Sequence, residues 1–286
     1  MLRDSISREI RPRVSVVIAA KNSEKTVLLA VRSALNGLRR YDEVLVMNDN
    51  SSDQTGLVLR GIRDRRLRIF ESSVTLGRSE ARNRLISESK GELIAILDAD
   101  DFSLPWRFEL GRRALNHYDA VFSTALVFGS ALKLLPFLPQ IPRAIHSNLF
   151  AQELLGRNPV VHSTAIYRKS AIPSSPPYRD SEAEEYDLWL RMINAGCLMR
   201  RFRFPWVLYR LHEGQASRAP GFNKRGEECP FVIGEQEKLA SHLQLTGLSL
   251  DEAKAQARSQ TSSRSLLARI EIRGLPERVK RLLRIS

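Results

Sequence analysis

The chain has little of what extracellular and membrane-spanning proteins need. Its two cysteines, Cys197 and Cys229, give no metal-binding spacing and no disulfide framework, which fits a reducing compartment. The first residues contain no apolar core of signal-peptide length. The most apolar stretch, residues 120–145, is broken by Lys133 and by three prolines, so it is too interrupted to span a membrane. We therefore expect a cytoplasmic protein.

Several common ligand-binding motifs are also missing. No Gly-x-Gly-x-x-Gly sequence follows the first expected strand and no P-loop lysine motif is present, which disfavours dinucleotide- and triphosphate-binding architectures. Zinc-finger spacing and RNP-type aromatic motifs are absent as well, so specific nucleic-acid recognition is not expected. The net charge of +13, with an isoelectric point near 10.2, comes largely from arginine pairs spread along the chain. Such a charge calls for anionic partners, and anionic lipid or a phosphorylated small molecule fits.

The first hundred residues alternate between strand-like and helix-like segments. Expected strands at 14–18, 43–47, 68–70 and 93–97 alternate with expected helices at 23–38, 53–63 and 78–89. This alternation predicts an α/β fold with a doubly wound, mostly parallel, Rossmann-like sheet. The pattern changes at about residue 119, after which we expect a strand over 120–128, a helix over 181–195, a strand near 207–209 and helices within 235–286.

Three carboxylates crowd the end of the fourth expected strand. The segment Leu97-Asp98-Ala99-Asp100-Asp101 directly follows the apolar run 93–96. In open α/β sheets this end of a strand lies where ligands bind. Because crowded carboxylates repel one another, the segment predicts a divalent cation, and oxygen donors suit Mg²⁺ or Mn²⁺. Mg²⁺ completes its coordination with water and substrate phosphates, so we expect a phosphate-bearing substrate.

Other interpretations of this segment are open. Asp101 or Ser103 could cap a following helix, which explains one carboxylate but not three. A calcium loop beginning at Asp98 would need a ligand and a glycine where Phe102 and Ser103 stand. An aspartyl phosphotransferase, with Asp98 as its nucleophile, also begins with Asp-x-Asp after a strand.

The loops after the first two expected strands are polar as well. Asn48-Asp49-Asn50-Ser51-Ser52-Asp53 follows the second strand and Ala19-Ala20-Lys21-Asn22 ends the first. Each segment taken alone is typical of a turn with helix-capping residues. Because parallel strands end at the same edge of a sheet, we expect both loops to lie beside the acidic segment.

Together these segments resemble the family 2 glycosyltransferases of the GT-A fold. The resemblance rests on residues 14–22, 48–53, 77–83 and 97–101, whose order, spacing and strand context match. Downstream, residues 184–191 resemble the acidic acceptor-side motif of that family. The sequence Tyr209-Arg210-Leu211-His212, followed by Ser217, resembles its closing motif. The resemblance covers roughly residues 12–220.

The resemblance also implies an organisation into parts. Residues 12–118 would form the nucleotide-sugar-binding half of a GT-A domain, and residues 119–220 the acceptor-binding half of the same domain. Residues 235–286 would form a basic helical C-terminal extension outside the resemblance.

Donor-side roles follow from the resemblance residue by residue. Asp49 would accept a hydrogen bond from the nucleobase, expected to be uracil, and Arg82 would lie near the phosphates, which its charge suits. The implied nucleotide contacts are Ala19, Lys21, Asn22, Asp49, Arg82, Asp98 and Asp100. The implied metal ligands and their supports are Asp98, Asp100, Asp101 and His212. The alternative for His212 is a surface histidine without a role.

Acceptor-side roles follow in the same way. A carboxylate takes the proton of the acceptor hydroxyl, with Glu185 as first choice and Asp187 as second. Glu184 and His162 are implied beside the acceptor. For Glu184 and Glu185, the alternative is the charged first turn of a helix, where glutamate favours the helix dipole.

The chain departs from the usual family pattern at two places. The family usually shows Pro-Ala-Tyr-Asn after the first strand, whereas this chain has Ala19-Ala20-Lys21-Asn22, which removes an aromatic ring that could stack on the base. Lys21 could meet a phosphate instead. The acceptor motif usually reads Glu-Asp, whereas Glu184-Glu185 here places the base one methylene farther along, and catalysis by proximity is sensitive to such a change.

The implied activity is transfer of a sugar from a nucleotide-diphosphate sugar, expected to be a UDP-sugar, with inversion at the anomeric carbon. The acceptor would be a hydroxyl of a glycan or of a lipid-linked acceptor, as in cell-surface polysaccharide synthesis. Two other functions are open on the sequence alone. They are a non-catalytic scaffold that binds nucleotide-sugars and the aspartyl phosphotransferase.

The C-terminal residues 264–286 place leucine, isoleucine and valine among arginine and lysine. From Pro276 onward, Val279, Leu282 and Leu283 form one apolar face of an expected helix with a cationic opposite face. Such a segment suits an anionic membrane surface, which predicts peripheral attachment at the inner face of the plasma membrane. The alternative is that the same face packs on this domain or on a second subunit of a homo-oligomer.

Overall fold

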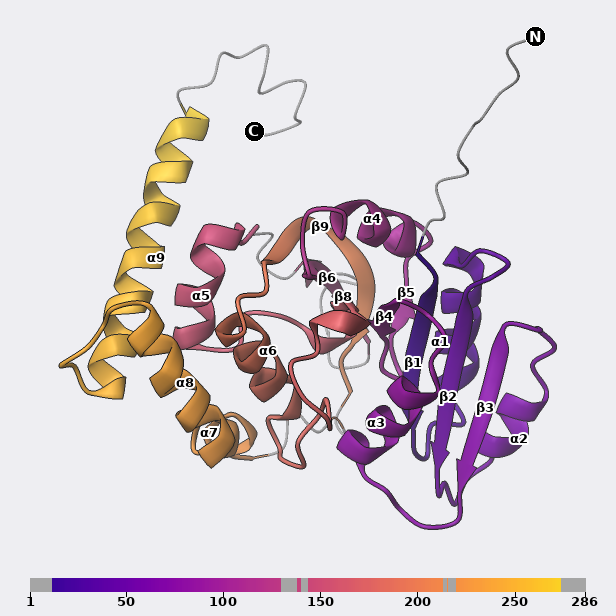
Figure 1. The fold of residues 1–286 in the computed structure, drawn as a ribbon. Helices are drawn as coiled ribbons and strands as arrows, with labels where there is room; N and C mark the ends of the chain where they lie inside the picture. The colour runs from indigo at the N-terminus through magenta and orange to yellow at the C-terminus, as the bar shows by residue number, and fades with distance from the viewer. Residues whose placement is uncertain (1–11, 130–137, 140–143, 213–214, 216–219, 274–286) are drawn as a thin grey trace, which may run out of the picture.

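A central sheet with helices on both faces organises the chain (Figure 1). The C-terminal residues form a further group of helices beside the sheet. The computed structural model describes residues 12–129, 138–139, 144–212, 215 and 220–273. The α/β fold expected from the alternating pattern is confirmed. In the described part of the chain no helix is long and apolar enough to cross a membrane.

The N-terminal half of the sheet is parallel. Its strands are β1 (Val14–Ala20), β2 (Glu43–Asp49), β3 (Leu67–Ser72) and β4 (Leu93–Ile96), in the order β3-β2-β1-β4. The crossover helices are α1 (Val27–Gly37), α2 (Thr55–Arg60) and α3 (Arg78–Glu88). All seven lie where the sequence predicts them, with ends that shift by up to four residues. The pairing of Ala20 with Asn48 and of Val17 with Ile96 brings the loops after β1, β2 and β4 to one edge.

The other half of the sheet is mixed. It continues from β4 through β8 (Ile166–Arg168), β6 (Ala120–Phe128), β9 (Met199–Arg210) and β5 (Phe102–Ser103), with β7 (Leu138–Pro139) paired to β6. β8 runs antiparallel to both β4 and β6, whereas β6 and β9 are parallel. The strand expected near residues 207–209 is the end of the longer β9, whose first residues are rich in arginine.

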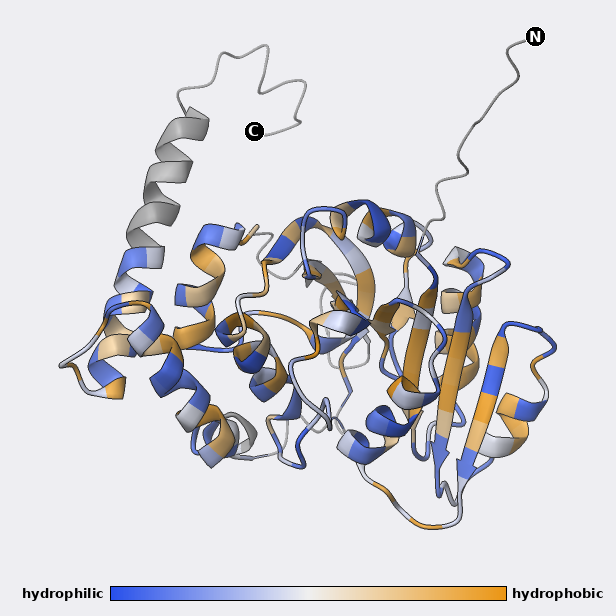
Figure 2. Cartoon of the chain, viewed as in Figure 1, coloured by the Kyte–Doolittle hydropathy of each residue, from blue (hydrophilic) through white to orange (hydrophobic). Residues whose placement is uncertain are grey.

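Alternate residues of the parallel strands enter two separate cores, which makes the sheet hydrophobic on both faces (Figure 2). In β1, Val17 faces the core that contains α3. Val16 and Ile18 face the core that contains α1. The near-continuous apolar runs of β1, β2 and β4 are therefore explained by burial from both sides.

The remaining helices follow β4 in the sequence. They are α4 (Arg107–Ala114), α5 (Ser147–Gly156), α6 (Glu184–Asn194), α7 (Phe222–Glu227), α8 (Pro230–His242) and α9 (Leu250–Arg273), with short 3-10 turns η1 (His162–Thr164) and η2 (Lys169–Ala171). α6 packs on α8, and α5 packs on α9 (Figure 1). The expected helical extension is thus present. The side chains of residues 264–286, on which the membrane prediction rests, lie outside the described residues.

A buried ion pair joins the start of β2 to α4. The Asp42 carboxylate accepts hydrogen bonds from the backbone N–H groups of Val14 and Arg39 and from the guanidinium of Arg112. Both charged side chains are almost fully buried. We expect Asp42→Ala to lower the free energy of unfolding by about 3 kcal/mol or more, because it leaves a buried guanidinium and buried N–H groups without their acceptor. Urea denaturation measures the change.

Glu80→Ala is the control for this variant. Glu80 pairs with Arg84 at 2.7 Å on the surface of α3, with both side chains about half exposed. An exposed pair of this kind contributes about 0.5 kcal/mol or less. A loss of stability in Asp42→Ala no larger than in the control would contradict the importance of the buried pair.

Candidate active site

A cleft of about 1550 Å³ opens at the edge of the sheet where β1, β2 and β4 end. It extends past the N-terminus of α6 to the C-terminal end of α5 and to α9. The sequence-predicted residues that line it are Ala19, Lys21, Asn22, Asp49, Arg82, Asp98, Asp100, His162, Glu184, Glu185 and His212. Two predicted residues, Asp101 and Asp187, do not line it.

The loops after β1 and β2 are tied together at the donor end of the cleft. Asn22 adopts a positive φ of 49°. Its side-chain oxygen accepts the backbone N–H of Ser52 at 2.9 Å, and its own N–H donates to Ser51 Oγ at 3.0 Å. The Lys21 ammonium donates to Thr75 Oγ1 at 2.9 Å. These contacts hold together the loops after β1, β2 and β3, at the end of the cleft where β1 and β2 end.

Asp49 organises the entry to α3. Its two oxygens accept the backbone N–H groups of Leu76 at 2.6 Å and of Gly77 at 3.0 Å. Gly77 has φ 84°, a conformation that glycine adopts without strain, and α3 begins at the next residue. Asp49 therefore fixes the loop that leads into α3, the helix that carries Arg78 and Arg82. Its predicted contact with a nucleobase stays a prediction.

Arg82 joins the two halves of the site. Its guanidinium donates to Glu184 Oε1 at 2.8 Å and to Asp98 Oδ1 at 3.0 Å, and its side chain is only 6% exposed. Burial alone would lower the pKa of Arg82, but the charges of Asp98 and Glu184 outweigh it and raise that pKa. Burial would likewise raise the pKa of Asp98, and Arg82 lowers it instead. Arg82 thus stays cationic and Asp98 anionic.

The acidic segment after β4 crowds three carboxylates together. Asp100 Oδ2 lies 2.8 Å from His212 Nε2, so the structure brings together two of the predicted metal ligands. Burial, together with the charge of Asp98, raises the pKa of Asp100. Asp101 is buried, and its Oδ1 accepts the backbone N–H of Arg210 at 2.9 Å. Burial and its two aspartate neighbours raise the pKa of Asp101 well above its usual range.

A buried arginine that the sequence analysis missed lies beneath this segment. Arg107 is fully buried and donates from Nη2 to the carbonyl oxygens of Ile96 at 2.6 Å and Ala165 at 3.2 Å. Its Nε and Nη1, like Asp101 Oδ2, have no hydrogen-bond partner among the described residues. Burial lowers the pKa of Arg107 to about 9, so it remains cationic at neutral pH. Arg107 is the first residue of α4, and its local sequence carries no signal of burial.

Three carboxylates at the N-terminus of α6 have different surroundings. Glu184 is buried and accepts from Arg82 and, at 3.3 Å, from Arg78. Glu185 is half-buried in the cleft, and its carboxylate makes no hydrogen bond to another described residue. Burial and the charge of Glu184 raise the pKa of Glu185 to about 7.

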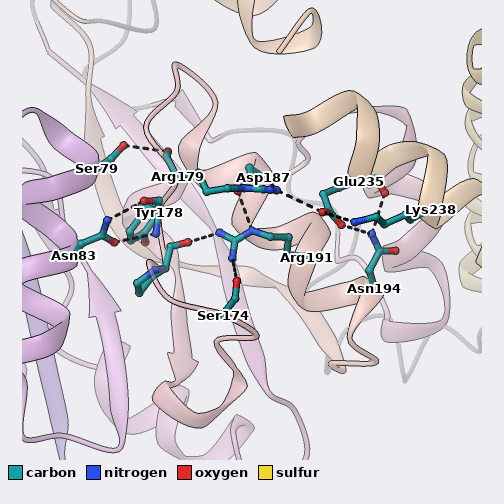
Figure 3. Close-up of polar contacts among 11 residues, drawn as sticks. Ser79, Asn83, Ser174, Tyr178, Arg179, Asp187, Arg191, Asn194, Glu235 and Lys238 are labelled. Atoms are coloured by element: carbon teal, nitrogen blue, oxygen red, sulfur yellow. Dashed lines mark hydrogen bonds and ion pairs between the residues drawn. The ribbon is translucent and has the colours of Figure 1, made fainter. Parts of the chain in front are cut away.

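Asp187 is enclosed by arginines on the other side of α6 (Figure 3). Its oxygens accept from Arg179 Nε and from Arg191 Nε, both at 2.9 Å, and its side chain is fully buried. Arg191 also donates to Ser174 Oγ at 3.0 Å. Figure 3 shows that this network continues to Glu235 on α8, so Asp187 joins α6 to the segment before it and to the C-terminal helices.

His162, in the 3-10 turn η1, lies in the wall of the cleft. Its Nε2 is 3.0 Å from the Tyr178 hydroxyl, and the ring is mostly buried beside Trp189. Burial, together with the charge of Arg82, lowers the pKa of His162 well below its usual value, so the ring is neutral. It borders the cleft as predicted, next to Ser163, whose Oγ accepts the Asp98 N–H at 2.9 Å.

Two further arginines of the cleft, Arg78 and Arg210, belong to the segments that carry the family resemblance, but the sequence assigns them no role. Arg78 is about half exposed and borders the cleft beside Glu184. Arg210 donates from Nε to the Asp100 carbonyl at 2.8 Å. Within the described residues no group of three or more histidine, cysteine or carboxylate side chains is arranged as a metal cage.

Comparison with known proteins places the chain in a family. Residues 15–174 match the family described as Glycosyl transferase family 2. The chain therefore belongs to the family 2 glycosyltransferases, and it is a glycosyltransferase. This membership decides against the aspartyl phosphotransferase, which shares only the Asp-x-Asp segment.

Characterised relatives come from bacterial polysaccharide synthesis. The chain is 27% identical over 205 residues to the Escherichia coli UDP-Glc:alpha-D-GlcNAc-diphosphoundecaprenol beta-1,3-glucosyltransferase WfaP, covering 71% of this chain and 79% of that protein. It is 28% identical over 280 residues to the succinoglycan biosynthesis protein ExoO of Rhizobium meliloti, covering 91% and 77%.

A solved structure shares the fold. The chain resembles S. aureus TarS residues 1–349 in complex with UDP-GlcNAc with a TM-score of 0.61, at 15% identity, covering 84% of this chain and 69% of that one. The expected GT-A-type fold is confirmed by this likeness.

Asp49→Ala tests the role of Asp49 in the loop before α3. We expect amide hydrogen exchange at Leu76 and Gly77 to become about tenfold faster or more, because both N–H groups lose a carboxylate acceptor. Mass spectrometry of peptides covering residues 73–80 measures the exchange. Glu71→Ala, which removes only an exposed pair with Arg60, is the control. Equal exchange in the two variants would show that Asp49 does not hold this loop.

Proposed function

We propose that this glycosyltransferase transfers a hexose from a UDP-sugar to a hydroxyl of a glycan or lipid-linked acceptor, with inversion, in cell-surface polysaccharide synthesis. The names of the E. coli and Rhizobium relatives support the donor and the pathway class. The protein would work in the cytoplasm at the inner face of the plasma membrane, where such acceptors are reached. Assembly into a homo-oligomer stays a prediction.

The observation that carries the proposal is the contrast between Glu185 and its neighbours. Glu184 is tied to Arg82 and Asp187 is enclosed by two arginines, whereas Glu185 borders the cleft without a hydrogen-bond partner among the described residues. A pKa of about 7 suits a general base at neutral pH, because the group is then substantially ionised and still basic. Glu185 is therefore favoured over Asp187 as the base.

The reaction divides the cleft between donor and acceptor. The UDP moiety would lie over the loops after β1 and β2, with Arg78 and Arg82 near its phosphates. Glu185 would remove the proton of the acceptor hydroxyl as that oxygen attacks the anomeric carbon from the face opposite the diphosphate. Attack on an α-linked donor then gives a β-linked product.

The acidic segment fits a divalent cation on the chemistry of its donors. Asp98, Asp100 and His212 offer oxygen and nitrogen atoms, and a magnesium or manganese ion commonly uses one or two carboxylates together with substrate phosphates. Burial and the charge of Asp98 raise the pKa of Asp100, so a bound cation would stabilise its ionised form. When bound, Mg²⁺ or Mn²⁺ would neutralise the charge that develops on the leaving diphosphate. Asp101 is buried beside Arg210 and would support this segment without binding the ion.

Asp100→Ala tests the metal site. We expect it to abolish Mn²⁺-dependent sugar transfer and the extra thermal stabilisation that Mn²⁺ gives to the UDP complex, because a ligand is lost. The melting temperature of the free protein should change little, since the Asp100 side chain is partly exposed and packs in no core. Near-normal metal-dependent turnover in this variant would refute the assignment. Glu80→Ala, a change on the exposed surface of α3, is the control.

Glu185→Gln tests the base. We expect turnover to fall by about 10²-fold or more with UDP affinity unchanged, which is the range of general-base contributions. In the parent enzyme kcat/KM should rise with pH and level off above about pH 7, because Glu185 acts only when it has lost its proton. This rise should disappear in Glu185→Gln. Retention of the rise, or a larger loss of turnover in a folded Asp187→Asn protein, would contradict the assignment.

A further inference from the structure

The cleft does not end at Glu185. Its far end is bordered by Arg157, directly after α5, and by Lys254 and Arg258 on α9. Lys254 and Arg258 lie downstream of residues 15–174, the part of the chain that matches the family. Lys254 and Arg258 on α9 therefore border the cleft from outside the matched part of the chain, whereas Arg157 lies within it.

The three cations are brought together by close packing. The side chain of Arg258 crosses Gly156, since a Cβ atom added at Gly156 would lie 3.0 Å from Arg258 Cγ. Arg157 is the next residue along the chain. Lys254 stands one turn from Arg258 on the same face of α9, a spacing at which like charges repel each other. Because residue 156 is a glycine without a Cβ atom, the Arg258 side chain fits against it.

None of these three side chains forms an ion pair or hydrogen bond with another described residue. Most of the other arginines near the site are paired, as Arg78 and Arg82 are with Glu184. Position at a helix C-terminus accounts for Arg157 alone, because Lys254 lies near the N-terminus of α9, where the dipole disfavours a cation. Packing and helix stability thus give no reason for the group.

Arg157, Lys254 and Arg258 lie on the side of α6 away from the loops after β1 and β2, where the UDP-sugar is proposed to bind. In Figure 1, α6 stands between the parallel strands and the pair α5 and α9. The hydroxyl of Tyr186, the residue after Glu185, donates to the Leu154 carbonyl of α5, and α5 ends at Gly156 beside Arg258, so α6 adjoins the end of the cleft that carries the cations. An acceptor whose hydroxyl meets Glu185 would extend toward these cations, away from the UDP-sugar.

We propose that Arg157, Lys254 and Arg258 bind the diphosphate group of the acceptor. The inference rests on the proposed transfer to a lipid-linked acceptor and specifies how that substrate is recognised. Arginine forms paired hydrogen bonds with phosphate oxygens, and lysine adds a compact charge. The carboxylates of Glu227 and Asp251 also border the cleft and would suit the hydroxyls of the acceptor's sugar.

Binding of farnesyl diphosphate to the UDP- and Mn²⁺-saturated protein tests the proposal. UDP occupies the donor site, so that the probe's diphosphate is left to the acceptor end. We expect the double variant Lys254→Gln/Arg258→Gln to bind farnesyl diphosphate at least tenfold more weakly by calorimetry, while its affinity for UDP stays unchanged. Farnesol, which has the same chain without phosphate, should bind equally weakly to both proteins.

The control is Arg113→Gln/Lys224→Gln, which removes the same two kinds of charge from highly exposed positions. It should bind farnesyl diphosphate as the parent does. Equal binding by both double variants, or binding of farnesol as tight as that of its diphosphate, would overturn the proposal. Absence of UDP binding in the parent protein would instead overturn the proposed donor. Weaker binding of farnesyl diphosphate by Lys254→Gln/Arg258→Gln than by the control variant would then still support the acceptor proposal, because neither variant changes the loops after β1, β2 and β4, and equal binding would still overturn it.

Discussion

Repulsion among carboxylates at one edge of the sheet is the constraint on which the site depends. Asp98 and Asp100 come from the end of β4, and Glu184 and Glu185 from the start of α6. One buried guanidinium, that of Arg82, contacts Asp98 and Glu184 and so holds the two halves of the domain together. It does not neutralise Asp100 or Glu185, whose pKa values stay raised. The protein therefore leaves room for the charges that a substrate and a cation bring.

The parts of this arrangement that follow from local sequence were predictable. A buried strand with a polar loop after it is recognisable from a few residues, and parallel pairing necessarily gathers such loops at one edge. The contact between Arg82 and Glu184 joins residues 102 positions apart, so only the folded chain reveals it. Buried arginines are the hardest case, because Arg82 and Arg107 resemble the many solvent-exposed arginines of a chain with a net charge of +13.

The first turn of α6 shows the same limit at the scale of single residues. Glu184, Glu185 and Asp187 lie within four positions, and a helix spreads such residues around its axis. Composition and the favourable dipole apply to all three equally. Packing separates them, because α3 supplies an arginine to Glu184 and the segment before α6 supplies one to Asp187. Only the rotation of the helix leaves Glu185 facing the cleft.

The order of charges along the cleft then gives a reason for the C-terminal helices. In the proposed function, donor recognition uses loops of the parallel sheet, and the acceptor meets the far wall of the cleft. That wall is built by α5 and α8, which pack on α6 through Tyr186 and Gln236, and by α9, which packs on α5 and α8. Because α6 also carries Glu185, the proposed acceptor wall and the proposed base are parts of one packed unit. A change of acceptor can thus be made in these helices without altering the donor half.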